Sequence, residues 1–176
     1  MLWASMLKRA QILVIGHNES GCTADHEKIA YETGANVAKL GATLITGGLG
    51  GVMQSSCKGA NEAGGIAIGV LPHNKRGEEN EFCNVVIPTG LGYARDFVNA
   101  LSADAVIIIG GGAGTLSEMC AAYMYDRPMV AIRGTGGMAD EYVGKYMDYR
   151  KKFLIRGADS PIVAVKTALK LCGHGV

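Results

Sequence analysis

The sequence lacks the motifs that mark several common active sites. It has no G-x-S-x-G nucleophile turn, no H-E-x-x-H zinc motif and no G-x-x-x-x-G-K-[ST] phosphate loop. Its five cysteines form no C-x-x-C pair, and an odd number argues against a disulfide framework. We therefore expect no metal site, scattered cysteines in or near the core, and a reducing, cytoplasmic location.

The sequence also lacks long apolar runs and an excess of charge. No stretch approaches the roughly 18 uninterrupted apolar residues of a membrane-spanning helix. The 17 basic and 16 acidic residues leave a net charge of +1, which gives no electrostatic support for nucleic-acid binding. We expect neither a membrane nor a nucleic acid as partner.

Apolar runs and helix-like segments alternate along the whole chain. The 26 glycines follow no fixed period and stand at the ends of the apolar runs. This alternation predicts one α/β domain over residues 1–176, with a doubly wound parallel sheet of about seven strands and helices on both faces. The expected strands are 11–15, 42–46, 66–71, 85–88, 105–109, 128–132 and 153–155. The expected helices are 24–40, 52–63, 92–102, 115–125, 138–152 and 161–171.

Two glycine-rich turns follow apolar runs and precede predicted helices. The first has the sequence TGGLGGVM (46–53), and the second has GGGAGTLSE (110–118). Glycine lets backbone N–H groups approach a ligand, and a helix N-terminus favours an anion. We expect Ala113, Gly114 and Thr115 to form such an anion site, in a crevice shared with the turns at 16–23 and 90–95.

Three further side chains have a functional and a structural interpretation. Glu118 is either a site residue or the partner of Thr115 in a capping box. Arg95 is either a bidentate clamp for a phosphate or carboxylate or an ordinary exposed arginine. His17, with its neighbour Asn18, either lines the crevice or belongs to an ordinary polar loop. The run of three glycines before the helix predicted at 115–125 favours a ligand-binding site, because a helix cap needs no such run.

The segments GGLGGVM (47–53), GYAR (92–95) and GGAGTLSE (111–118) resemble the LOG-like group of Rossmann-like proteins, long mislabelled lysine decarboxylases. The branch with the strongest resemblance contains the molybdenum cofactor carrier proteins. Cytokinin-activating members are phosphoribohydrolases, and the resemblance implies Glu118 as their catalytic glutamate and Arg95 as their arginine. The sequence departs from the hydrolase signatures at three points. Gly110 replaces the proline, Gly92-Tyr93 replaces Met-His, and Asp96 replaces the lysine. No lysine is marked as holding pyridoxal phosphate, so a decarboxylase is not expected.

The predicted function is a cytosolic carrier of a phosphorylated small molecule, either a molybdenum cofactor-like pterin or a nucleotide, with no required cofactor. The alternative is a phosphoribohydrolase that cleaves nucleoside 5′-monophosphates, with Arg95 and Glu118 catalytic only in that case. A nucleotide-sensing or structural oligomer with a vestigial site is a third interpretation. The predicted ligand-binding residues are Gly16, His17, Asn18, Gly47, Gly48, Gly50, Gly51, Met53, Arg95, Gly111, Gly112, Ala113, Gly114, Thr115 and Glu118.

A homodimer or larger homo-oligomer is also expected. The helices predicted at 92–102 and 115–125 carry apolar residues on more than one side, and one chain's sheet covers only one side of each. The resemblance implies dimers as well. The residues concerned are Phe97, Val98, Leu101, Met119, Tyr123 and Met124.

Overall fold

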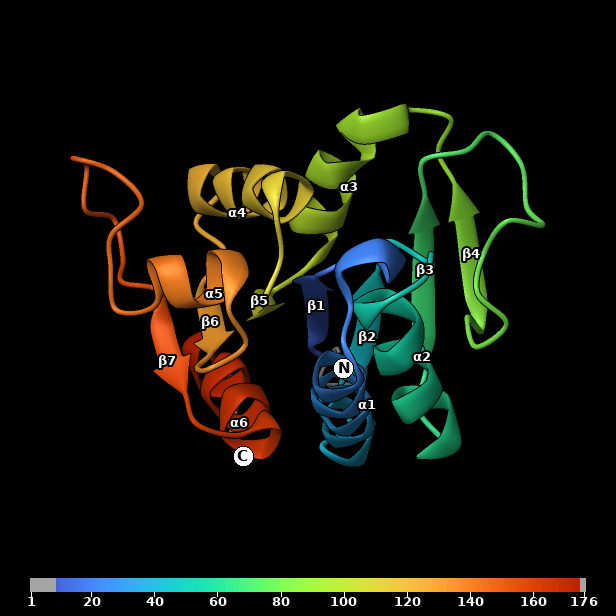
Figure 1. Ribbon diagram of the computed structural model, residues 1–176, viewed down its shortest axis with the longest axis horizontal. Coiled ribbons are helices and arrows are strands. Elements are labelled where there is room, and N and C mark those ends of the chain that lie inside the picture. The colour runs from blue at the N-terminus through green and yellow to red at the C-terminus, as the bar shows by residue number, and fades with distance from the viewer. Residues whose placement is uncertain (1–8, 175–176) are drawn as a thin grey trace, which may run out of the picture.

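The computed structural model describes residues 9–174 and contains a seven-stranded, all-parallel sheet (Figure 1). The strand order is β4-β3-β2-β1-β5-β6-β7. The strands are β1 (Gln11–Gly16), β2 (Thr43–Thr46), β3 (Ala67–Leu71), β4 (Val85–Pro88), β5 (Ala105–Ile109), β6 (Met129–Ile132) and β7 (Arg156–Ala158). The predicted single α/β domain with a parallel sheet of about seven strands is confirmed.

Within residues 9–174, six α-helices cover the two faces of the sheet. One face carries α1 (Ala24–Lys39), α2 (Val52–Glu62) and α6 (Pro161–Leu171). The other carries α3 (Arg95–Ser102), α4 (Ala113–Met124) and α5 (Gly137–Tyr142). Two short 3-10 turns, η1 (Glu19–Gly21) and η2 (Gly92–Ala94), precede α1 and α3.

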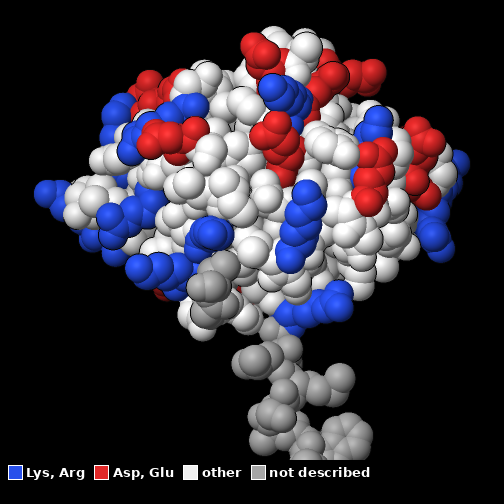
Figure 2. Space-filling model, turned by 90° about the horizontal axis from the view of Figure 1, so that it is seen from below, with Lys and Arg blue, Asp and Glu red and all other residues white. Residues whose placement is uncertain are grey.

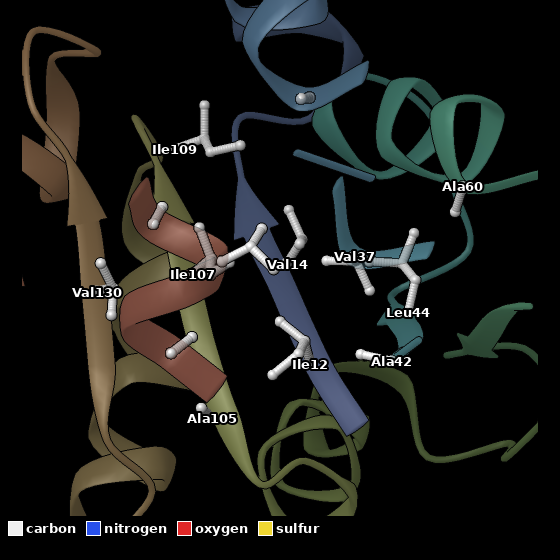
Figure 3. Close-up of a cluster of buried hydrophobic side chains, with 14 of the residues drawn as sticks. Ile12, Val14, Val37, Ala42, Leu44, Ala60, Ala105, Ile107, Ile109 and Val130 are labelled. Carbon is white, nitrogen blue, oxygen red and sulfur yellow. The ribbon is translucent and has the colours of Figure 1, made fainter. Parts of the chain in front are cut away.

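The core consists of two layers because successive side chains of a strand point to opposite faces. In β1, Ile12 and Val14 face α1, α2 and α6, whereas Leu13 and Ile15 face the other three helices. Figure 3 shows the first layer, with Val14 and Ile107 side by side at its centre. Apolar side chains buried on both faces explain why the central strands read as continuous β-branched runs.

The central strands β1 and β5 pair in parallel from Ile12↔Ala105 to Gly16↔Ile109. From β1 the chain adds β2, β3 and β4 toward one edge of the sheet, and from β5 it adds β6 and β7 toward the other, so the topological switch point lies between β1 and β5. Ligands of open α/β sheets bind beyond the carboxyl ends of the strands at such a switch point. The second glycine turn follows β5 directly, and the 17–23 loop follows β1.

The predicted helix over 138–152 is wrong beyond Tyr142. The α5 helix is six residues long, Gly144 then adopts a positive φ of 74°, and Tyr146 forms an isolated antiparallel bridge with Leu154. The last strand is β7 rather than 153–155, because Ile155 N–H bonds the Lys145 carbonyl in the bridge region. Tertiary contacts therefore override the helical pattern of this segment.

The apolar residues of α3 and α4 lie on more than one side of these helices, as predicted. Met119 and Tyr123 are buried and belong to the core layer beneath α4. Phe97, Leu101 and Met124 are exposed, and Val98 is half-buried. An apolar surface on α3 and α4 therefore remains outside the core.

Basic and acidic side chains are interspersed over the face shown in Figure 2. Lys and Arg are most numerous on its left side, which in Figure 1 is the side of the segment between α5 and β7. Within residues 9–174, no helix is long and apolar enough to cross a membrane.

Candidate functional site

The first glycine turn folds back against the end of β1. Gly48 and Gly51 have positive φ angles of 76° and 68°, which glycine adopts without a steric penalty. A Cβ atom at position 51 would lie 2.6 Å from the His17 carbonyl oxygen, and Val52 N–H donates to that oxygen at 3.0 Å. The turn therefore lies directly against the His17–Asn18 loop, as the crevice hypothesis requires.

The second glycine turn ends in the N-terminus of α4. Gly112 is the N-cap, so Ala113, Gly114 and Thr115 are the first three helical residues, whose N–H groups have no partner within the helix. Gly112, Ala113 and Gly114 are exposed, and a Cβ at position 112 or 114 would meet nothing within 4 Å. The helix therefore begins on an exposed surface at Ala113 and Gly114, whereas Thr115 is buried.

The capping-box interpretation of Thr115 and Glu118 is wrong. Helix α4 begins two residues earlier than predicted, so Thr115 is the third helical residue rather than the N-cap. Its hydroxyl donates to the Gly16 carbonyl at 3.1 Å, which ties α4 to the end of β1. The Thr115 side chain thus holds the turn in place.

Residues 135–139, which follow β6, form hydrogen bonds with the second glycine turn. Gly110 N–H donates to Thr135 Oγ1 at 2.9 Å, and the N–H groups of Met138 and Ala139 bond the carbonyls of Gly111 and Gly110. His26 extends this support, since Thr23 N–H donates to its Nδ1 and its Nε2–H donates to the Thr135 carbonyl at 2.8 Å. These contacts therefore fix the position of the second glycine turn at the start of α4.

His17 lies between the two turns. Its ring is 4.8 Å from that of His26, centroid to centroid, and a Cβ at Gly110 would lie 2.7 Å from its Nε2. Burial, and secondly the nearby His26, lowers the pKa of His17. His17 is therefore a neutral hydrogen-bonding group at neutral pH rather than a positive charge.

A buried polar cluster joins α3, α4 and the first turn. Arg95 Nη1 lies 2.9 Å from Asp96 Oδ1 and 3.8 Å from Glu118 Oε1. A Cβ at Gly47 would lie 2.9 Å from Arg95 Nη1, so a larger residue there would displace the guanidinium. Arg95 is only 9% exposed, which excludes the interpretation of an ordinary surface arginine.

Glu118 is mainly a neutral carboxylic acid at pH 7. Burial raises its pKa from 4.5 to about 8, and the negative charge of Asp96 acts in the same direction. A hydrogen bond from Asn99 Nδ2 to Glu118 Oε1, at 2.8 Å, and the charge of Arg95 oppose that shift. A raised pKa of this kind, caused by burial beside a charged cluster, is typical of functional sites.

Two polar atoms of this cluster have no partner among the described residues. They are Arg95 Nε, a donor, and Asn99 Oδ1, an acceptor, and both are buried. Buried polar atoms are normally hydrogen-bonded, so each fits a water or ligand group that completes the cluster. Both carboxylate oxygens of Asp96, in contrast, have a partner, because Oδ1 accepts from Arg95 and Oδ2 accepts from the Ser117 hydroxyl.

Two cavities flank the first glycine turn and share Leu49. One, of about 340 Å³, is lined by Leu49, Pro72, His73, Gly92, Tyr93 and Arg95. The other, of about 390 Å³, is lined by Asn18, Glu19, Ser20, Leu49, Gly50 and Met53. These volumes lie within the range of small-molecule sites.

The structure brings the predicted residues to one edge of the sheet, but in different roles. Gly16 and Gly48 serve close backbone packing, since a Cβ would collide with the Ile109 carbonyl oxygen at position 16 and with the Leu71 side chain at position 48. A Cβ at Gly111 would overlap the Thr115 side chain. Gly50 and Met53 line a cavity.

Sequence reasoning missed Asn99, Leu49, His73 and Tyr93 as members of this region. Asn99 could have been predicted from its spacing, because it follows Arg95 by four residues and therefore lies on the same face of the helix. Leu49 lies within the first glycine turn itself. His73 and Tyr93 come from loops whose approach to Arg95 depends on the tertiary fold.

The chain is similar to proteins of the molybdenum cofactor carrier group. The molybdenum cofactor binding protein of Rippkaea orientalis is 31% identical, with a TM-score of 0.83 over 94% of this chain and 98% of that one. The molybdenum cofactor carrier protein of Chlamydomonas reinhardtii is 33% identical, with a TM-score of 0.80 over 93% and 98%.

A further relative and a family model agree with this grouping. An uncharacterized protein of Archaeoglobus fulgidus is 40% identical over 127 residues, which cover 72% of this chain and 82% of the relative. The model described as the SLOG cluster4 family matches residues 9–161, most of the chain and both glycine turns. The protein therefore belongs to the SLOG cluster4 family.

Proposed function

We propose that this protein is a cytoplasmic carrier of a phosphorylated small molecule, either a molybdenum cofactor-like pterin or a nucleotide. The observation that carries the proposal is the exposed N-terminus of α4, where open space surrounds Gly112 and Gly114. The similarity to two molybdenum cofactor proteins at 31% and 33% identity supports a pterin as cargo.

The phosphate of the cargo binds the N–H groups of Ala113, Gly114 and Thr115. These donors and the helix dipole favour an anion, and the first turn of α4 holds no acidic side chain. Arg95 Nε and Asn99 Oδ1 are the buried atoms available to the polar groups of the cargo. The donor set therefore fits a phosphorylated ligand.

The heterocycle of the cargo occupies the cavity between Leu49 and Tyr93. This cavity combines an apolar side chain, an aromatic ring and the guanidinium of Arg95 at one site. Planar rings bind well in such surroundings, through apolar contact with one face and hydrogen bonds at the edge.

One observation favours a second candidate, the hydrolysis of nucleoside 5′-monophosphates. Glu118 and Arg95 form a buried pair, and the pKa of Glu118 is raised to about 8. By analogy with glycoside cleavage, a carboxylic acid of raised pKa assists the cleavage of an N-glycosidic bond by protonating the departing base. Asp96 argues against this role. It stands at the position where the hydrolases have a lysine, and it forms an ion pair with Arg95.

The carrier proposal is tested with Gly114→Val. The new side chain has space in the fold but covers the exposed N–H groups, so the melting temperature is expected to stay within a few degrees while ligand binding is lost. Native mass spectrometry first identifies the co-purifying ligand, and calorimetry then measures a pterin phosphate and adenosine monophosphate. Lys166→Val, on the exposed side of α6, is the matched control. Unchanged binding by Gly114→Val would place the anion elsewhere.

The hydrolase candidate is tested by incubating the protein with a panel of nucleoside monophosphates. We expect little or no free base, because Gly92, Tyr93 and Asp96 depart from the hydrolase signatures. Robust release of base that disappears in Glu118→Gln, with ligand affinity retained, would replace the carrier proposal by the hydrolase. Retained affinity is the informative control, because the backbone donors of α4 hold the phosphate in either case.

A further inference from the structure

Two cysteines from distant parts of the chain meet behind the first glycine turn. Cys57 lies on α2, and Cys83 lies just before β4, 26 residues later. Their Sγ atoms are 3.9 Å apart. Cys57 is fully buried, whereas Cys83 is half-buried and therefore the sulfur that solvent reaches. The Cys22 and Cys172 sulfurs contact backbone carbonyls instead.

The two sulfurs have different acidities. Hydrogen bonding from Cys83 lowers the pKa of Cys57, aided by Thr46 and Asn80 and opposed by burial. Hydrogen bonding to Cys57 and burial raise the pKa of Cys83. Cys57 is therefore the more acidic of the two thiols and is suited to attack an oxidised Cys83 as a thiolate.

The groups around this pair also hold the first glycine turn. Thr46 Oγ1 lies 3.2 Å from Cys57 Sγ and accepts a hydrogen bond from Gly48 N–H at 3.0 Å. Asn80 N–H donates to the Gly48 carbonyl at 2.8 Å, and Asn80 Nδ2 donates to the Leu49 carbonyl at 3.0 Å. Cys83 N–H in turn donates to the Asn80 carbonyl at 3.3 Å. Asn80 therefore links Cys83 to Gly48 and Leu49 through hydrogen bonds.

We propose that Cys57 and Cys83 are a redox-active pair whose reversible oxidation to a disulfide by a peroxide changes the conformation of the first glycine turn. A disulfide needs an S–S distance of about 2.05 Å, so the two sulfurs must approach by about 2 Å. Cys57 is fixed in a helix, whereas Cys83 lies in the turn before the edge strand β4. Cys83 and the adjoining 80–83 segment therefore make the movement.

The reaction takes place in two balanced steps. Cys83 reacts first because it is the sulfur that solvent reaches: its thiol attacks one peroxide oxygen, its proton passes to the departing hydroxyl, and a sulfenic acid and one water are formed. The Cys57 sulfur then attacks the Cys83 sulfur, and the departing hydroxyl takes the Cys57 proton to leave as a second water. Both thiols are oxidised, hydrogen peroxide is reduced to two waters, and an added dithiol reverses the bond by exchange.

The test is peroxide treatment of the full, folded chain. We expect the intact mass to fall by two hydrogens and proteolysis to yield a Cys57–Cys83 cross-linked peptide that dithiothreitol removes. Hydrogen exchange measured on the same sample is expected to shift in residues 46–52 and 78–84 and to stay unchanged in α6. This readout requires no ligand, so its outcome is separate from that of the carrier proposal.

Matched variants define the site. Cys83→Ser and Cys57→Ala are each expected to abolish the cross-link and the exchange shift, whereas Cys172→Ser retains both. Circular dichroism establishes that each variant is folded, and Cys83→Ser serves alone if the buried Cys57→Ala does not fold. The proposal is overturned by a different cysteine pairing, by over-oxidation of Cys83 without a cross-link, or by a cross-link that leaves exchange at 46–52 unchanged.

Discussion

Glu118 is a carboxylic acid side chain that the fold removes almost completely from water. It is 8% exposed, lies 3.8 Å from Arg95 and accepts a hydrogen bond from Asn99. Burial nevertheless dominates, and the pKa of Glu118 is raised to about 8. The protonated acid can donate a hydrogen bond to a ligand at neutral pH, whereas a carboxylate only accepts.

The raised pKa of Glu118 has a defined consequence for stability. Between pH 4.5 and about 8 the unfolded chain has released this proton and the folded chain still holds it. Rising pH therefore favours unfolding, by at most about 1.4 kcal/mol per pH unit from this group. The contribution is complete below pH 4.5 and is lost as the pH rises through about 8.

Glu118→Gln removes this titration while its side-chain oxygen still accepts from Asn99. We expect the variant to gain stability relative to the native chain as the pH rises from 5 to 8, measured by urea unfolding at each pH. Glu32→Gln replaces an exposed carboxylate on α1 and is expected to leave the native pH profile unchanged. A Glu118→Gln curve parallel to the native one would show that Glu118 is ionised in the folded protein.

Among the elements, the segment between α5 and β7 differs most from its predicted structure. Asp148 accepts hydrogen bonds from Tyr123 Oη at 2.6 Å, Arg150 Nε at 2.7 Å and Arg150 N–H at 2.9 Å. The hydrogen bond from the Arg150 side chain is the main reason that the pKa of Asp148 is lowered to about 2. These contacts fix a turn where helical periodicity predicts a continuous helix.

Asp148→Ala is expected to loosen this segment and leave the sheet intact. The three donors lose their common acceptor, so amide exchange should accelerate over residues 143–155 and remain slow in β1 and β5. Asp159→Ala, which removes the exposed carboxylate paired with Arg133, is the control and should not affect that segment. Because the pKa of Asp148 is lowered, its stabilising effect is present above pH 3.8 and disappears as the pH falls through about 2.

Elements with a local cause could be predicted from the sequence, and those with a tertiary cause could not. The β-branched run at β5 and the glycine turn before α4 follow from local preferences for extended and left-handed backbone. The contacts of Asp148 with Tyr123 and of Glu118 with Asn99 join residues 19 or more positions apart. The sequence places the start of α4 two residues too late, because the run of small residues before it contains no side-chain cap.

The whole molecule exposes an apolar surface on the helices beside the candidate site. Phe97 and Leu101 of α3 are 42% and 41% exposed, and Met124 and Tyr125 at the end of α4 are 43% and 50% exposed. Arg127 Nη2 donates to the Leu101 carbonyl, which places the two helix ends together. Clustered apolar side chains of this size on a folded surface are typical of protein interfaces.

We propose that this surface is the contact between copies of the chain in a homodimer or larger homo-oligomer. Light scattering at micromolar concentration should give at least twice the chain mass of 18.4 kDa. Phe97→Glu combined with Leu101→Glu should yield monomers, because an interface would bury four charges without partners. Val163→Glu places a charge on the exposed side of α6, on the opposite face of the sheet, and should leave the mass unchanged. A native chain that scatters as a monomer, or a double variant that remains oligomeric, would assign the α3 and α4 surface another role.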